Sequence, residues 1–269
     1  MKKGNNDILR KEELFHDQWA ESIDVDSVFV DEFFEASTAP ENRWIIKRMG
    51  NIKGLKVLEL GAGAGEASVY LAKLGADVMA TDISLGMLEV VKKLAKIHNV
   101  EVMTKQSLAD KIDFENDSFD IVYAANLLHH VDIEESLKEI NRVLRKGGRF
   151  YSWDPLAHNP AINIYRRQAM EVRTEDEHPI RWEQIDLFKK YFEKVDYECS
   201  WFFTLWIFVK FKFIDGVDPN KERYWKKIIS EHTRLQSTFD FLEKIDKSFL
   251  KIIPFFKRWC WNITFECKK

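Results

Sequence analysis

The sequence predicts an α/β fold in which helices cover both faces of a parallel sheet, and three observations predict it. Short apolar segments alternate with helical patterns over about 100 residues from Lys56 onward, and such alternation indicates a parallel sheet. The apolar segments lack regular polar alternation, as expected of strands that are buried on both faces. The first segment ends in a glycine-rich turn, VLELGAGAG (57–65), at the edge where such sheets bind ligands.

The elements of this core follow in chain order. Residues 7–36 have amphipathic helical patterns, and a further helix is expected in STAPENRWIIKRMGN, with Pro40 in its first turn and Gly50 just past its end. Gly147 and Gly148 are expected to stop the last core helix. The expected strands are 56–60, 77–81, 100–104, 119–125 and 149–154, and the expected helices between them are 66–75, 84–97 and 133–144.

The alternation ends after Asp154. The remaining expected elements are helices at 159–172 and 181–192, a strand at 194–202, an aromatic and basic helical segment, and a last strand in RWCWNITFEC (258–267). The chain is therefore divided into an N-terminal helical cap (1–50), a ligand-binding core (51–200), an aromatic helical insert (201–257) and the last strand of the core (258–269).

The composition excludes several classes of protein. Hydrophobic residues are 45% of the 269 residues and charged residues 32%, which favours a packed core over disorder. The net charge of -3 argues against a protein that holds long nucleic acids through their phosphates. The cysteines, Cys199, Cys260 and Cys267, form no C-x-x-C pair and no metal-ligand spacing, so we expect buried, reduced thiols, no metal site and a cytoplasmic protein. The longest apolar run, WFFTLWIFV, has nine residues and is too short to cross a bilayer, and the N-terminus lacks the apolar stretch of a secretory signal.

The spacing of the glycines predicts the kind of ligand. Dinucleotide-binding turns follow G-x-G-x-x-G and place a pyrophosphate at a helix N-terminus, whereas Gly61, Gly63 and Gly65 follow G-x-G-x-G after Glu59. An acid beside the turn repels a pyrophosphate and favours a ligand with a cationic amine or sulfonium. Asp82 ends the second strand, where a carboxylate accepts hydrogen bonds from ribose hydroxyls. An adenosine with positive charge in place of phosphates is S-adenosylmethionine.

Four segments then resemble a known family when they are taken together in order. VLELGAGAGEASVYLA, ADVMATDISLGML, FDIVYAANLLHHV and VLRKGGRFYSWDP are similar to the class I S-adenosylmethionine-dependent methyltransferases over residues 40–155. The resemblance implies a Rossmann-like, seven-stranded sheet whose last strand is antiparallel. It also implies that S-adenosylmethionine binds at the carboxyl ends of the first, second and fourth strands.

The resemblance further implies which residues hold the methyl donor. They are Glu59, Gly61 and Gly63 along the methionine part, Asp82 at the ribose, Ile83 and Met87 over the adenine, and Asn126, whose backbone carbonyl reaches the amino group. Many members have an acid after the third strand that binds the adenine amine, but here Ser107 or Leu108 stands at that point and Asp110 follows slightly late. Trp19 is expected to close over the donor, because the N-terminal helix crosses the cleft in this family. Each of three residues also has an alternative role. Asp82 could cap the following helix, Glu59 could support the glycine turn, and Trp19 could pack in the core.

The general base is sought among polar residues near the same edge of the sheet. Asp154 and His158 follow the fifth strand and are the first candidates, since loops at the carboxyl ends of strands carry function. His130 is a further candidate because histidine titrates near neutral pH, although the pair His129 and His130 also has a purely structural interpretation. The alternative for the segment after Asp154 is that Asn159 caps a helix and the arginines pair with the acids of RTEDE (173–177).

The predicted function is in-line transfer of a methyl group to a small molecule, with a hydrophobic or lipid-like acceptor as one form of it. The segment AANLLHH stands where many methyltransferases that act on adenine or glutamine have an N/D-P-P-Y tetrad, so a nucleic acid acceptor is not expected. The insert 201–257 is interpreted as a packed lid, with a substrate tunnel or a peripheral membrane contact as alternatives. Two other functions stay open: a silent donor-binding partner or regulatory subunit and, less favoured, a nicotinamide-dependent oxidoreductase.

Overall fold

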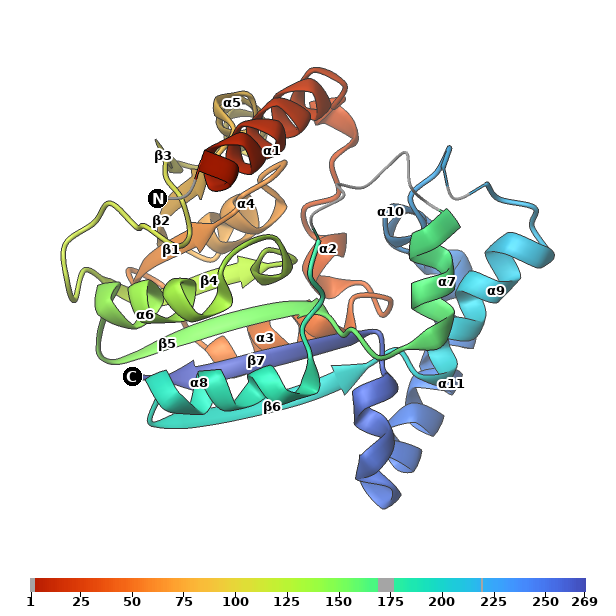
Figure 1. Ribbon diagram of the computed structural model, residues 1–269. Helices are drawn as coiled ribbons and strands as arrows, with labels where there is room; N and C mark the ends of the chain where they lie inside the picture. The colour runs from red at the N-terminus through yellow and green to blue at the C-terminus, as the bar shows by residue number, and fades with distance from the viewer. Residues whose placement is uncertain (1–2, 169–176, 219) are drawn as a thin grey trace.

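A seven-stranded sheet forms the centre of the molecule (Figure 1). The computed structural model describes residues 3–168, 177–218 and 220–269. The strands are β1 (Lys56–Leu60), β2 (Asp77–Asp82), β3 (Met103–Gln106), β4 (Phe119–Ala125), β5 (Leu144–Pro155), β6 (Lys194–Ser200) and β7 (Asn262–Lys268), in the order β3-β2-β1-β4-β5-β7-β6. The pairings among β1 to β5 are parallel, and β7 is antiparallel to both β5 and β6. The predicted Rossmann-like sheet with an antiparallel last strand is confirmed.

Helices cover both faces of this sheet, as predicted. On one face, α6 (Ile133–Val143) and α8 (Ile185–Tyr191) bury apolar side chains such as Leu137 and Phe188 against the strands. On the other face lie α2 (Glu32–Glu35), α3 (Pro40–Met49), α4 (Glu66–Lys73) and α5 (Leu85–Ile97). Phe34, Ile45 and Val69 from these helices are fully buried. Since both faces are covered, the strands carry apolar residues on both sides.

The helix starts agree with the residues that cap them. Ser84 accepts a hydrogen bond from the Met87 amide at the start of α5, and Asp132 accepts one from the Glu135 amide at the start of α6. Pro40 begins α3, and Gly50 follows its end at φ 67°. The predicted positions of Pro40 and Gly50 are confirmed, and Ser84 and Asp132 are residue types that commonly cap helices.

The N-terminal region is less continuous than its helical pattern indicated. Helix α1 (Lys3–Glu21) is followed by a short 3-10 turn, η1 (Val25–Ser27), and by α2. Helix α1 lies against α5 (Figure 1). The Asp17 carboxylate in α1 accepts hydrogen bonds from the Gly86 amide, at 3.1 Å, and from the Ser84 hydroxyl. The cap region is therefore attached at the end of β2, beside the predicted donor site.

Several boundaries differ from the predicted ones. Strand β3 lies later than 100–104, and β7 starts at Asn262 because the 3-10 turn η6 (Pro254–Trp259) precedes it. The glycines at 147–148 do not stop a helix: α6 already ends at Val143, and the glycines lie inside β5. The register between β4 and β5 shifts at this point, and a Cβ on Gly148 would lie 2.8 Å from the Arg145 carbonyl oxygen. Glycine is therefore required by an irregular strand pairing rather than by a helix end.

The segments that join β5, β6 and β7 also differ in detail. Helix α7 spans Pro160–Gln168, and the rest of the helix expected at 159–172 lies outside the described residues. The predicted helix at 181–192 is divided into a 3-10 turn, η4 (Trp182–Gln184), and α8. Strand β6 ends at Ser200, two residues before the predicted end.

The aromatic insert is helical and has a core of its own. Its elements are η5 (Phe203–Leu205), α9 (Trp206–Phe213), α10 (Tyr224–Ser230), α11 (His232–Ile252) and η6. Trp201, Phe208 and Phe211 pack with residues of α10 and α11, beyond the carboxyl ends of β4 and β5 (Figure 1). Other rings remain outside this core, since Phe213 is 74% exposed and Phe255 57%. Within the described parts of the chain, no helix is long and apolar enough to cross a membrane.

The three cysteines lie in the β6 and β7 region. Cys199, Cys260 and Cys267 are buried thiols that form no disulfide. Burial raises the pKa of the Cys199 thiol well above its ordinary range. A buried protonated thiol is inert, in agreement with the expected structural role.

Candidate functional site

A cavity of about 590 Å³ opens beyond the carboxyl ends of β1, β2 and β4. Its walls come from the glycine turn, the ends of these strands, helix α1 and the aromatic insert. The predicted donor residues that line it are Trp19, Glu59, Gly61, Gly63, Asp82, Ile83, Ser107, Leu108 and Asn126. Residues from distant parts of the chain that also line it include His129, His130, Tyr165, Glu177, Trp201 and Arg223.

The glycine turn lies close to its neighbours. Gly61 has φ 69°, and a Cβ there would lie 2.8 Å from the Leu127 side chain. Gly65 has φ 92°, and a Cβ there would lie 3.1 Å from the Val91 Cα. Positive φ and this close approach both favour glycine. The turn therefore presents bare backbone to the cavity.

Asp82 is held at the end of β2 by backbone amides. Its Oδ2 accepts a hydrogen bond from the Gly63 amide at 3.0 Å, and its Oδ1 accepts one from the Ser84 amide at 2.9 Å. Burial raises the pKa of Asp82 and the amide hydrogen bonds oppose that rise. Ser84 is the residue that caps α5, so Asp82 does not serve as that cap. The result is a fixed carboxylate in the cavity wall.

Glu59 lies under the glycine turn. Its side chain is almost fully buried, accepts a hydrogen bond from the Ser68 hydroxyl and lines the cavity. Burial raises the pKa of Glu59 to about 8, and the acids Glu66 and Asp82 add to that rise. Glu59 therefore both supports helix α4 and faces the cavity, so the geometry agrees with each of its two sequence interpretations.

Two of the predicted adenine contacts differ in position. Ile83 lines the cavity, whereas Met87 is fully buried and is not part of the cavity wall. Met87 packs with Trp19 and Val90 between α1 and α5, so direct contact of Met87 with a ligand is corrected to a supporting position. Asp110, which the sequence placed slightly late, lines the cavity together with Ser107 and Leu108.

The turn after β4 brings two histidines to the cavity floor. It forms a 3-10 turn, η2 (Leu128–His130). The Nδ1 of His129 lies 2.8 Å from Oδ1 of Asp154, and the His129 amide donates to the same oxygen at 3.2 Å. Because β4 and β5 are neighbours, Asp154 at the end of β5 lies beside this turn. The pair orients the His129 imidazole toward the cavity, which His129 lines.

The prediction that Asp154 is itself the general base needs correction. Asp154 is fully buried and is not part of the cavity wall. Burial raises the pKa of Asp154 well above its usual range, while backbone amides of residues 127–129 oppose the rise. A base must reach the proton that it abstracts. Asp154 does not line the cavity and is connected to it only through His129. Asp154 is therefore a positioning residue.

His158 is also displaced from the site. Its Nε2 accepts a hydrogen bond from the Trp182 amide at 3.2 Å and lies 4.0 Å from Glu183, and His158 is not part of the cavity wall. Asn159 accepts a hydrogen bond from the Ile162 amide at 3.0 Å, so the helix-cap interpretation of Asn159 agrees with the structure. Of the acids in RTEDE, Glu175 and Asp176 lie outside the described residues.

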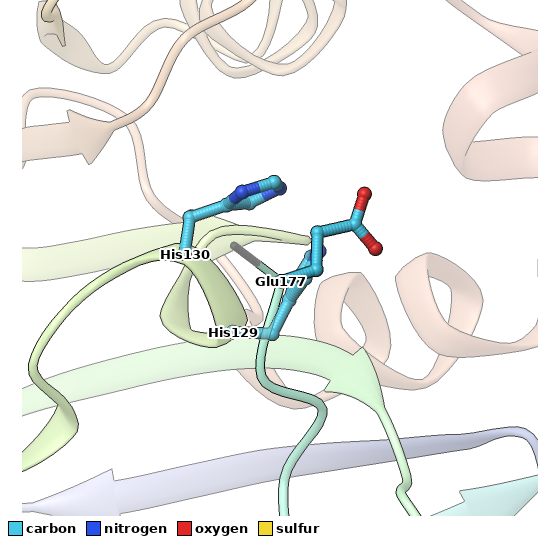
Figure 2. A group of neighbouring side chains, drawn as sticks. All are labelled: His129, His130 and Glu177. Atoms are coloured by element: carbon cyan, nitrogen blue, oxygen red, sulfur yellow. The ribbon is translucent and has the colours of Figure 1, made fainter. Parts of the chain in front are cut away.

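A third acidic side chain joins the two histidines. His129, His130 and Glu177 each offer one nitrogen or oxygen atom, and these atoms lie within 4.8 Å of one another (Figure 2). The His178 amide donates to the His129 carbonyl at 2.7 Å, which holds this segment against η2. Glu177 is far from the histidines in sequence, so no ligand spacing could have revealed this group.

The insert contacts helix α1 across the cavity. The Arg223 guanidinium lies 4.2 Å from the centre of the Trp19 ring, and Lys226 Nζ lies 5.0 Å from it. Burial lowers the pKa of both cations. In the described parts of the chain no carboxylate forms a salt bridge with Arg223. The sequence predicted Trp19 at the site but not Arg223, because the aromatic residues around Arg223 in the sequence indicated only a packed lid.

Comparison with known proteins agrees with this geometry. Residues 58–152 match the family model of a methyltransferase domain. Over 121 residues the chain is 34% identical to the uncharacterized methyltransferase YcgJ of Bacillus subtilis (strain 168), which covers 44% of this chain and 48% of that protein. Over 118 residues it is 41% identical to a demethylmenaquinone methyltransferase of Clavibacter sepedonicus, which covers 43% of this chain and 46% of that protein. The chain spans about half the length of these curated relatives.

Solved structures share the fold over more of the chain. The structure of YcgJ has a TM-score of 0.54 at 20% identity and covers 87% of this chain and 97% of that one. An N-methyltransferase of Haemonchus contortus, solved with phosphomonomethylethanolamine and S-adenosylhomocysteine, has a TM-score of 0.55 at 24% identity, covering 84% of this chain and 51% of that one. At these identities the likeness concerns the fold alone.

The sheet order is Rossmann-like, and the family model identifies a methyltransferase domain within it. Residues 58–152 are a methyltransferase domain of the class I type, which uses S-adenosylmethionine as its methyl donor.

Proposed function

We propose that this protein transfers a methyl group from S-adenosylmethionine to a small-molecule acceptor. One observation carries the proposal: a single cavity joins the glycine turn and Asp82 to an oriented histidine and to the aromatic insert. Methyl transfer from a sulfonium is an in-line displacement, and the donor is already activated. The protein therefore needs mainly to align the acceptor with the donor and to exclude water.

The donor half of the cavity is the part formed by β1, β2 and the turn after β4. Asp82 would accept hydrogen bonds from the ribose hydroxyls, and Gly61 and Gly63 would pass along the methionine part. Glu59, once ionised, would favour the positive charge of the donor. Ile83, Ser107 and Leu108 would surround the adenine, and the backbone carbonyl of Asn126 would face the amino group.

The acceptor half is the part formed by η2, α7 and the insert. Tyr165, Trp201 and Trp261 line it, which favours an acceptor with an apolar or aromatic body. Arg223 lines the same cavity and offers a guanidinium to a carboxylate or phosphate. The anionic group that Arg223 would bind belongs either to the acceptor or to the methionine part of the donor, which ends in a carboxylate. These side chains thus favour a small hydrophobic acceptor that carries one anionic group.

Proton removal from the acceptor would fall to His129 rather than to Asp154, His158 or His130. Asp154 lies 2.8 Å from Nδ1 of His129, which leaves the other ring nitrogen as the one directed to the cavity. An imidazole held by a buried carboxylate is a common arrangement for general base catalysis. An acceptor that needs no base, such as a thiolate, would not depend on this pair.

The experiment uses S-adenosylmethionine labelled in its methyl group, the purified protein and an extract of its own cell. Label is measured in lipid, aqueous small-molecule, protein and RNA fractions, with Asp82→Ala protein as the control. Label in the lipid or the aqueous fraction supports the proposal. Label in the lipid fraction indicates a lipid-like acceptor, with the insert as a tunnel or membrane contact. Label in the aqueous fraction indicates a polar acceptor, with the insert as a lid. Donor binding with label in no fraction, at several extract concentrations, would overturn the enzyme and favour a silent donor-binding partner.

A further inference from the structure

Three side chains on the acceptor side of the cavity form an arrangement typical of a metal centre. We propose that His129, His130 and Glu177 bind a divalent first-row transition cation. The three candidate ligand atoms lie within 4.8 Å of one another (Figure 2). Two histidines and one carboxylate are a ligand set of catalytic zinc sites and of non-haem iron sites, both of which leave positions open for a substrate or water.

The contact between His129 and Asp154 independently points to a metal ligand. Histidines that bind metals usually donate their other ring N–H to a carboxylate, which fixes the tautomer and the orientation of the ring. Nδ1 of His129 lies 2.8 Å from Oδ1 of Asp154, and Asp154 is fully buried. The buried carboxylate therefore directs the second nitrogen of His129 toward His130 and Glu177.

His130 adds a buried nitrogen that lacks a hydrogen bond. Its Nδ1 has no hydrogen-bond partner among the described residues, and Oε1 of Glu12 lies 3.8 Å from it. A buried polar atom without a partner is destabilising unless something else satisfies it. The rings of His129 and His130 have centroids 4.1 Å apart, so one ion can contact both after small side-chain rotations.

The surrounding charge favours a cation over an anion. Glu12, Asp132 and Glu135 line the same cavity around η2. The backbone also holds the third ligand in place, because the His178 amide donates to the His129 carbonyl at 2.7 Å. This main-chain hydrogen bond ties the segment of Glu177 to η2.

A cation at this position deepens the proposed function, on which its chemical role rests. The cluster lines the cavity that holds the proposed acceptor. A bound cation would coordinate an oxygen or nitrogen of the acceptor and lower its pKa, in place of proton removal by His129. Cation binding itself does not depend on methyl transfer, so the two proposals are tested separately.

The test titrates Co²⁺, and then Zn²⁺ in competition, into chelator-treated protein that carries no histidine tag and no donor. Visible d–d absorption reports coordination, and calorimetry gives the stoichiometry. The expected result is one cation per chain. His130→Ala and Glu177→Gln should each weaken binding at least about 10-fold, because each removes one of three ligands. His178→Ala is the matched control, since this exposed neighbour is outside the cluster, and it should bind like the parent.

Asp154→Asn provides the second arm. Loss of the carboxylate behind His129 should weaken cation binding by about 10- to 100-fold, with circular dichroism showing that the variant is folded. The proposal is overturned if the parent binds no cation, or if His130→Ala and Glu177→Gln bind as the parent does. Asp82→Ala should keep full cation binding, so failure of the donor site and failure of the metal site are distinguishable.

Discussion

The proposed donor half and acceptor half of the cavity, called its donor end and acceptor end below, are built in different ways. At the donor end, Glu59, Gly63 and Asp82 lie within one β–α–β segment, and Asp82 is held by backbone amides of the glycine turn and of Ser84. At the acceptor end, the side chains come from α1, η2, the segment at Glu177 and the insert. Local chain geometry therefore sets the donor end, whereas packing between distant segments sets the acceptor end.

This difference shows which residues of the site can be assigned from a family resemblance. The family match covers residues 58–152, which include the donor end and η2 but exclude Trp19, Glu177 and Arg223. The acceptor end lies mostly in segments that have no counterpart in that match. Changes at the donor end should thus affect donor binding directly, and changes at the acceptor end should affect rate and selectivity.

The largest effect is expected from Asp82→Ala. This substitution would remove the two hydrogen bonds that we propose between Asp82 and the ribose, so donor affinity should fall roughly 100-fold or more. Isothermal titration with S-adenosylmethionine measures the change. Asp77→Ala, an exposed residue at the other end of β2, is the matched control. If Asp82→Ala binds the donor as the parent does, the assignment of the donor end is wrong.

The next effect is expected from Asp154→Asn. The side chain keeps its size but loses the carboxyl group that contacts Nδ1 of His129, so methyl transfer should slow by roughly 10- to 100-fold while the donor dissociation constant stays unchanged. The pH profile of the rate should also change, because the substitution removes a titratable carboxyl group that is hydrogen-bonded to His129.

The matched control for this prediction is His158→Ala, because His158 lies outside the cavity wall. Its rate and its pH profile should equal those of the parent. A rate loss in Asp154→Asn without any change in the pH profile would indicate that Asp154 has only a structural role.

A smaller effect is expected from Glu59→Gln and depends on pH. The pKa of Glu59 is raised from 4.5 to about 8 in the folded protein. Between these values the unfolded chain loses the proton and the folded protein keeps it, so stability falls as pH rises toward 8 and is constant above it. The free energy of unfolding of the parent should therefore fall relative to Glu59→Gln by at least about 2 kcal/mol between about pH 5 and pH 8.

Chemical unfolding without donor at several pH values measures this difference. With donor, the same residue should act in the opposite direction: affinity for S-adenosylmethionine should rise with pH in the parent, because ionised Glu59 favours a cationic ligand. In Glu59→Gln this rise should be smaller. Equal pH dependence in both proteins would exclude a titrating Glu59.

The smallest effect is expected from Arg223→Met, which keeps an apolar chain on the Trp19 ring and removes the charge. Loss of one partly buried guanidinium–carboxylate contact should weaken ligand binding by roughly 5- to 20-fold. Lys221→Met, on the exposed surface of the insert, is the control. A weaker donor affinity in titrations assigns Arg223 to the donor carboxylate, whereas an unchanged donor affinity with a raised acceptor KM assigns it to the acceptor. No change in either would remove Arg223 from the site.

The sequence by itself determined the core of the fold and much of the donor end. The turn at 61–65 needs glycines because of its positive φ angles. The alternation of apolar strands with helical segments predicts a parallel sheet. Both features can be read from short stretches of sequence. The predicted strands agree with the structure within a few residues, except where the pairing of β4 with β5 decides the boundary. Gly148 is an example, because a neighbouring strand rather than its own helix requires it.

Only the tertiary structure decided how the acceptor end is built. Asp154 looked like a base because it ends a strand, but the neighbouring turn covers it, and His129 is the member of the pair that lines the cavity. Glu177 and Arg223 reach the cavity through the packing of η2 and of the insert. Contacts between residues this far apart depend on how whole elements pack, and no local periodicity or spacing contains that information.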